Sequence, residues 1–133
     1  MRKLLTTLFA IICVQTISAQ TRDDVLNTVK VYRGASLQTI SKIDSLSTSA
    51  DAVWVCETMR QPVIAMQNAM IAFQHHHTQQ ETMTLANDVK KALLFTQEEQ
   101  AGADKVGALL EKHKDDPAII AQQEMVSKST PLD

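Results

Sequence analysis

The feature that most constrains the fold is a run of residues at alternating spacings of four and three. It comprises Ala52, Cys56, Met59, Val63, Met66, Met70, Phe73 and His77. An α-helix has about 3.6 residues per turn, so this spacing places all of these side chains along one face of a helix. We therefore predict a long helix from Ala50 to His77 that packs lengthwise against its neighbours.

Pro62 interrupts this segment without changing the phase of the repeat. Proline has no backbone N–H, and its ring crowds the carbonyl group four residues earlier, here that of Thr58. A kink at Pro62 is therefore predicted. The alternative is that one helix ends near Arg60 and a second begins at Pro62. Flanking apolar residues such as Val53 and Ile71 widen the apolar face, which predicts a central position in the fold.

Helix starts recur along the rest of the chain. In a capping box, a threonine hydroxyl and an acidic or amide side chain three residues later accept hydrogen bonds from free backbone amides. The pattern occurs at Thr21, Thr48, Thr78 and Thr96, and Asp116-Pro117 is a further start because proline favours the first helical position. With few glycines, prolines and aromatic residues and no Asn-Gly turn, the chain is predicted to be all-α.

These starts define the remaining helices. The first is expected from Arg22 to about Ser47, weakened and bent at Gly34. Its core candidates are Leu26, Val29, Leu37, Ile40 and Ile43. Polar Thr96 and Glu99 interrupt the apolar pattern of residues 79–113, so we predict two helices there, 79–95 and 97–113.

The last helix is expected from Pro117 to about Lys128, with Ile119, Ile120 and Val126 facing the core. Short connections between such helices favour antiparallel packing. The prediction is a small up-and-down bundle of three to five helices that forms one domain, residues 20–133.

The N-terminus has the organisation of a secretory signal peptide. A basic start, Met1-Arg2-Lys3, precedes an apolar stretch at residues 4–17 and a small-residue exit, Ser18-Ala19. The apolar stretch is shorter than the roughly 20 residues that cross a bilayer. We predict that residues 1–19 are cleaved, that the protein is exported to the periplasm or the cell exterior, and that no stable membrane span is left. A retained anchor is the alternative.

Charge excludes one class of partner. Cleavage would remove Arg2 and Lys3 and so leave 11 of the 13 basic residues against 15 acidic ones, a net charge of −4. Nucleic acids bind to cationic surfaces, so a nucleic-acid partner is not expected. The wide apolar face of the central helix instead predicts a protein partner or self-association.

The mature chain would keep a single cysteine, Cys56, which excludes an internal disulfide. Its apolar neighbours Val53, Trp54 and Val55 favour a small buried residue. An intermolecular disulfide or a reactive thiol is the alternative.

His75, His76 and His77 form the most unusual string in the sequence. Neutral imidazole binds zinc, copper and nickel, but adjacent helical residues point about 100° apart, so one of the three faces any given site. The main interpretation is that they sit at the negative end of a helix dipole. The alternative is a metal site that combines this string with His113 and with Glu81 or Asp88.

No motif indicates catalysis or a resident cofactor. The chain lacks Gly-x-Ser-x-Gly, a phosphate-binding glycine loop, Glu-x-x-His pairs for a di-iron centre and Cys-x-x-Cys-His for haem. We therefore expect a non-enzymatic protein without a cofactor, a protein-interaction or accessory factor of the cell envelope. The alternative function is a metal- or cofactor-binding bundle that uses His75 to His77.

Overall fold

The computed structural model describes residues 21–129, which form five α-helices and one 3₁₀ turn and contain no β-strand. Their order is α2 (Arg22–Ser41), η1 (Ile43–Ser45), α3 (Ser49–His76), α4 (Gln79–Ala92), α5 (Gln97–Lys112) and α6 (Pro117–Ser129). The predicted all-α fold is thereby confirmed. The predicted signal peptide, residues 1–19, lies outside the described residues.

The predicted helix starts are all present. At Thr21, Thr48, Thr78 and Thr96 the threonine hydroxyl accepts a hydrogen bond from the backbone amide three residues on, and the acidic side chain at that position accepts one from the threonine amide. At the fifth start, Asp116 Oδ1 accepts from the Ala118 amide at 2.8 Å. Such caps stabilise a helix by about 1 kcal/mol each, so the helix starts are fixed locally.

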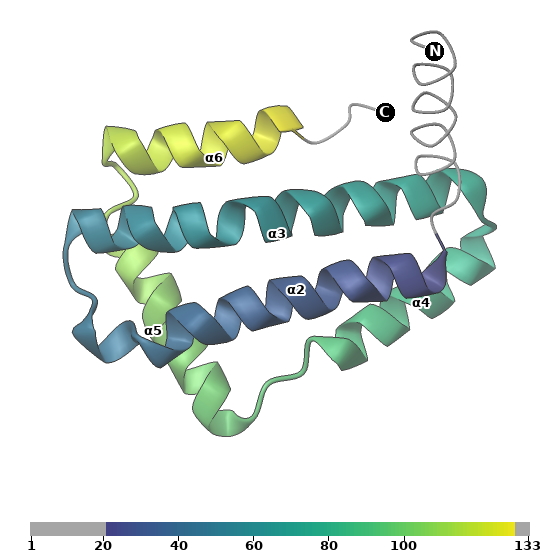
Figure 1. Cartoon of the computed structure of the whole chain (residues 1–133), viewed down its shortest axis with the longest axis horizontal. Helices are drawn as coiled ribbons and strands as arrows, with labels where there is room; N and C mark the ends of the chain where they lie inside the picture. The colour runs from purple at the N-terminus through teal and green to yellow at the C-terminus, as the bar shows by residue number, and fades with distance from the viewer. Residues whose placement is uncertain (1–20, 130–133) are drawn as a thin grey trace, which may run out of the picture.

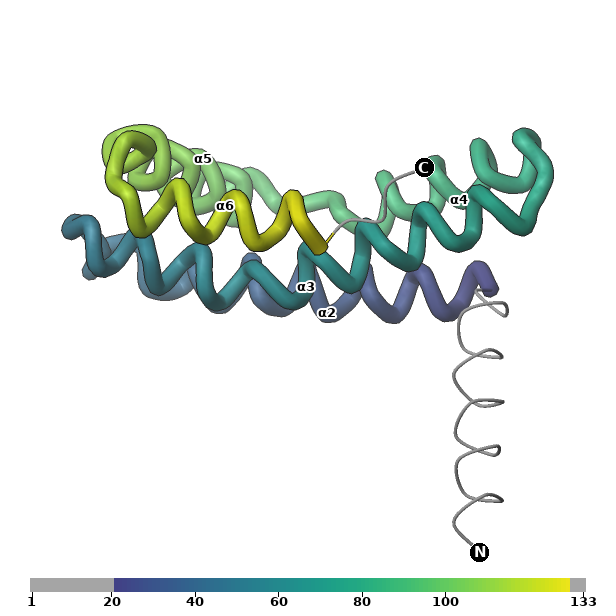
Figure 2. Tube along the Cα trace, turned by 90° about the horizontal axis from the view of Figure 1, so that it is seen from above, coloured from purple at the N-terminus to yellow at the C-terminus, as the bar shows by residue number. Residues whose placement is uncertain are grey.

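α2, α3 and α6 run along the long axis, with α2 antiparallel to α3 and α6 in the direction of α3 (Figure 1). α4 and then α5 lead the chain back toward the start of α3, and both lie oblique to the α2–α3 pair (Figure 1). Seen from above, α4 and α5 lie on the same side of the α2–α3 pair, over opposite ends of it (Figure 2). The third leg of the bundle, the segment that follows α3, therefore consists of two helices, α4 and α5, as the polar interruption at Thr96 predicted.

α3 is the central helix and contacts every other α-helix within residues 21–129. It takes part in two separate cores of buried residues. Its C-terminal half packs with α2 and α4 through Val25, Val29, Ala69, Phe73, Leu85 and Val89. Its N-terminal half packs with α5 and α6 through Ala52, Val55, Leu109 and Ile119.

Two of the eight residues in the predicted repeat on α3 are buried, and the other six are half-buried. Ala52 and Phe73 are buried, but Val55 and Ala69 are buried in place of their neighbours Cys56 and Met70. The repeat combines two faces of α3, and only one of them points at the core. The other face, which includes Cys56 and Met70, is half-buried.

α3 continues through Pro62 without a break. The alternative of a helix that ends near Arg60 is therefore wrong. Packing on both sides of Pro62, through Val55 before it and Ala69 after it, holds the two halves in one helix. The predicted kink at Pro62 stays a prediction.

Two predicted details are wrong. α2 ends at Ser41 rather than near Ser47, because hydroxyl groups take the carbonyl oxygens that a longer helix would use. Ser41 Oγ donates to Gln38 O at 2.7 Å and Ser45 Oγ donates to Lys42 O at 2.8 Å. On α6, Ile120 is 43% exposed instead of facing the core. Adjacent helical residues point about 100° apart, so only Ile119 of the pair reaches α3.

The broken third leg is held against α2 by two arginines. Arg22 Nε lies 2.8 Å from Asp88 Oδ2 of α4. Arg33 Nη2 donates to Leu94 O at 3.3 Å and to Glu99 Oε1 at 3.1 Å, and its guanidinium lies over the Phe95 ring. These contacts fix the point at which α4 ends and α5 begins. None of the helices in the described part of the chain has the length and apolarity that a bilayer crossing requires.

Candidate functional site

The structure places the three tandem histidines at the C-terminus of α3. His75 and His76 are exposed, and His77 is half-buried. The His77 ring stacks on the Phe73 ring with centroids 3.7 Å apart, and its Nδ1 lies 2.9 Å from Phe73 O. His77 therefore satisfies one of the carbonyl groups left free at the end of α3, an arrangement that agrees with the helix-end interpretation.

His113 lies at the other end of α3. Its Nε2 is 3.3 Å from Ser47 O, just before the first residue of that helix. A helix of 28 residues is about 42 Å long. The structure therefore does not bring His113 together with His75, His76 and His77. Within residues 21–129, no three His, Cys, Asp or Glu side chains are grouped closely enough to hold a metal ion.

A small cleft beside His77 is also lined by Arg22 and Glu81 and has a volume of about 320 Å³. Both charged groups already have partners. Arg22 pairs with Asp88, and Glu81 Oε1 accepts from the Thr78 amide at 3.2 Å. These capping hydrogen bonds, chiefly the one from the Thr78 backbone, lower the pKa of Glu81. Metal binding by the histidine string alone stays a prediction.

Cys56 is half-buried and free, and it packs against the core that α3 forms with α5 and α6. Burial raises the pKa of its thiol, and the charge of Glu57 raises it further. The thiolate, the reactive form, is therefore a small fraction at neutral pH. This environment fits a small packing residue better than a nucleophile.

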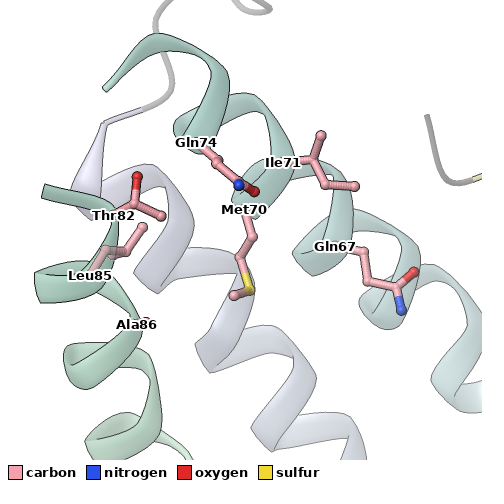
Figure 3. Close-up of a pocket in the computed structure, with 7 residues that line it drawn as sticks. All are labelled: Gln67, Met70, Ile71, Gln74, Thr82, Leu85 and Ala86. Carbon is pink, nitrogen blue, oxygen red and sulfur yellow. The ribbon is translucent and has the colours of Figure 1, made fainter. Parts of the chain in front are cut away.

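One hollow that the sequence did not predict is a groove between α3 and α4. It has a volume of about 420 Å³ and is lined by Gln67, Met70, Ile71, Gln74, Thr82, Leu85 and Ala86. Met70 and Gln74 extend from α3 toward the space between the helices, and Thr82 and Leu85 face them from α4 (Figure 3). None of these residues is charged, so the groove presents apolar surface and neutral hydrogen-bonding groups.

The groove lies on the same face of α3 that α6 covers further along. Arg60 Nη1 of α3 donates to Gln122 Oε1 of α6 at 3.0 Å. Gln67 and Gln74 follow Arg60 at intervals of seven residues, or about two turns, and so point in nearly the same direction. α6 therefore packs on the first half of this face, and the groove occupies the second half.

The difference in length between α3 and α6 is the sequence signal that could have revealed the groove. α6 has 13 residues and α3 has 28, so α6 covers less than half of α3. The remaining half of the face still carries apolar side chains, Met70 and Ile71, with glutamines beside them. On α4, Met83 next to the groove residue Thr82 is 62% exposed.

Comparison of the chain with protein-family models, with curated proteins and with solved structures finds no match.

Proposed function

We propose that the protein is an exported, non-enzymatic accessory factor of the cell envelope that binds an amphipathic helix of a partner protein in the α3–α4 groove. The observation that carries the proposal is the continuity of one face of α3. Half of that face is covered by α6, and the other half is the groove lined by Met70, Ile71 and Gln74.

α6 supports the choice of a helix as the occupant. It packs on α3 through Ile119 and through Gln122, which accepts the Arg60 hydrogen bond. Ile119 and Gln122 are three residues apart and so share one helix face. The groove offers a helix the same combination, apolar Ile71 and Met70 beside the amide of Gln74. Helix-in-groove binding of this kind uses apolar anchors at helical spacing.

The absence of charged side chains from the groove lining defines the partner further. A charge that enters an apolar groove without a counter-charge loses hydration and gains no ion pair. The partner helix is therefore one whose contact stripe is aliphatic or aromatic with neutral polar residues at its edges. Charged residues belong on its opposite face.

Export rests on the sequence of residues 1–19, with its basic start, apolar stretch and small-residue exit. Cell fractionation and N-terminal sequencing test it. We expect the protein in the envelope or periplasmic fraction with Gln20 as its first residue. A full-length chain confined to the cytoplasm would contradict this part of the proposal.

Site-specific photo-crosslinking in the producing cells tests the groove. A benzophenone amino acid at the groove position Gln74 is compared with one at Val31 of α2, which is 60% exposed and lies outside the groove. We expect an adduct from position 74 only, with the crosslinked residue in an amphipathic helix of another protein. The Ile71→Glu variant should lose the adduct because it places a charge in the groove.

Ile120→Glu is the matched control, because Ile120 is a partly exposed isoleucine on α6 that does not line the groove. It should keep the adduct. Adducts that persist in Ile71→Glu, or that occur equally from position 31, would contradict the proposal. An adduct of twice the mass of the chain would show self-association in place of a different partner.

A further inference from the structure

A second hollow lies between α2, α3 and α5, beneath the connection that joins α4 to α5. It has a volume of about 330 Å³, and Phe95 of that connection is part of its wall. Met59 and Val63 of α3 and Val106 and Leu110 of α5 form most of its apolar surface. This central cleft is separate from the α3–α4 groove and shares no lining residue with it.

Three of the α2 residues that line the central cleft bear hydroxyl groups, Tyr32, Ser36 and Thr39. Two of them are used within the helix, since Ser36 Oγ donates to Tyr32 O at 3.0 Å and Thr39 Oγ1 donates to Ser36 O at 2.8 Å. The Tyr32 hydroxyl forms no hydrogen bond with any residue between 21 and 129. Of the three hydroxyl groups, it is therefore the one that the described part of the chain leaves without a hydrogen-bond partner.

The cleft lining contains no charged residue. Arg33, next to Tyr32 in sequence, is paired with Glu99 at 3.1 Å, and its guanidinium carbon lies 5.4 Å from the centroid of the Phe95 ring. Its charge is thus already balanced beside the cleft. A charged ligand would lose hydration there without gaining a counter-ion, so the lining selects neutral molecules.

Two glycines of α5 contribute differently to this region. A Cβ atom on Gly102 would overlap Ile40 Cγ2, so Gly102 lets α5 approach α2 closely. A Cβ atom on Gly107 would have no atom within 4 Å, although Gly107 lines the cleft. Packing against the protein therefore does not account for a glycine at position 107. Gly107 is exposed and lines the cleft, so the edge of the cleft is open at this position.

We propose that the central cleft binds a small neutral amphiphile, whose apolar body lies against Met59, Val63 and Leu110 and whose single hydrogen-bonding group meets the Tyr32 hydroxyl. Pockets for small molecules have this character, with mostly apolar walls and few polar groups that fix orientation. The size of the cleft suits a ligand of about one or two rings or a short acyl chain with a neutral head group. Carboxylates and amines of the same size are excluded because they are charged at neutral pH.

Three naphthalene derivatives test the proposal on protein expressed from the full 133-residue sequence. Fluorescence titration compares 2-naphthol, naphthalene and 2-naphthoate. We expect 2-naphthol to bind, and 2-naphthoate to bind at least about ten-fold more weakly because its charge has no partner in the cleft. Tyr32→Phe should weaken 2-naphthol by about five-fold, the effect of one hydrogen bond, and change naphthalene by less than about two-fold.

The glycines provide a matched pair of variants. Gly107→Leu should reduce 2-naphthol affinity by about ten-fold or more, because a large side chain at this lining position would take up space that the ligand uses. Gly34→Leu is the control, because Gly34 also has open space around it but does not line the cleft. Circular dichroism melts establish that each variant is folded. Equal binding by 2-naphthol and 2-naphthoate, or unchanged 2-naphthol affinity in both Gly107→Leu and Tyr32→Phe, would overturn the proposal.

Discussion

Replacing Gly102 by alanine should have the opposite effect to the same replacement at Gly107, although both glycines lie inside α5. Alanine in a helix interior is favoured over glycine by about 1 kcal/mol. Gly107→Ala should show this gain in full, because its new methyl group meets no atom within 4 Å. Gly34→Ala in α2 should behave in the same way, for the same reason.

At Gly102 the new methyl group would overlap Ile40 Cγ2 and lie 3.4 Å from Ile40 Cβ. Carbon atoms in contact normally lie about 3.5–4.0 Å apart, so α5 or Ile40 must move. Ile40 is β-branched and stiff at χ1, which leaves little adjustment within its side chain. Overpacking of this kind costs about 1–3 kcal/mol, so Gly102→Ala should be destabilising by up to about 2 kcal/mol after the helix gain is subtracted.

Urea denaturation followed by circular dichroism measures the difference. Gly102→Ala should unfold at lower free energy than Gly107→Ala by about 1–3 kcal/mol, with a midpoint temperature lower by roughly 4–12 °C. Ile40→Val in the Gly102→Ala background serves as a second test, since a shorter side chain should relieve part of the strain. Equal stability of the two alanine variants would show that α5 does not cross α2 at Ile40. The packing of α5 on α2 would then differ from that described above.

Cys56 should react with a thiol reagent at pH 8 several-fold more slowly than free cysteine, since burial raises the pKa of its thiol. In urea, where the protein is unfolded, it should react at the rate of free cysteine. Equal reaction rates for the folded protein and for free cysteine would contradict this prediction. Backbone hydrogen bonds hold the pKa of Glu81 and Glu99 below the ordinary 4.5, so both stabilise the fold above that value and lose this effect as pH falls through their folded pKa. The unfolding free energy in urea should therefore drop between about pH 5 and 3, and less steeply in Glu81→Gln. Zinc should bind no more tightly to the wild type than to His113→Ala, because His113 lies far from His75–His77; calorimetry decides.

The parts of the fold that depend on neighbouring residues were predictable from the sequence. A capping box is completed within four residues, so the starts of α2 to α5 could be located from Thr21, Thr48, Thr78 and Thr96 alone. The end of α2 was missed because two further local contacts, from Ser41 and Ser45 hydroxyls to backbone carbonyls, compete with the helix. These side-chain hydrogen bonds are too weak to show from the sequence where the helix ends, because the packing around them decides whether they form.

The parts that depend on distant residues were not predictable. Thr96 and Glu99 predicted the break between α4 and α5, but they did not predict the contacts of Arg33 that hold it, which span 61 positions to Leu94 and 66 to Glu99. Gly102 looks in the sequence like a weak point in a helix, and only its contact with Ile40 explains it. The repeat on α3 could not reveal which of its two faces points inward, because that depends on where α2 and α6 pack.

The break in the third leg and the central cleft have one cause. The buried residues of α3 fall into two groups, Ala52 and Val55 near its start and Ala69 and Phe73 near its end. α4 contributes buried residues to one of these cores and α5 to the other. The connection between them must therefore pass over the middle of the α2–α3 pair (Figure 2). A single connection segment fills less space than a helix, and the cleft lined by Phe95 opens beneath it. A straight helix in place of α4 and α5 would close the cleft but could not reach both cores, so the chain gains a ligand-sized hollow from the same geometry that lets it complete two cores.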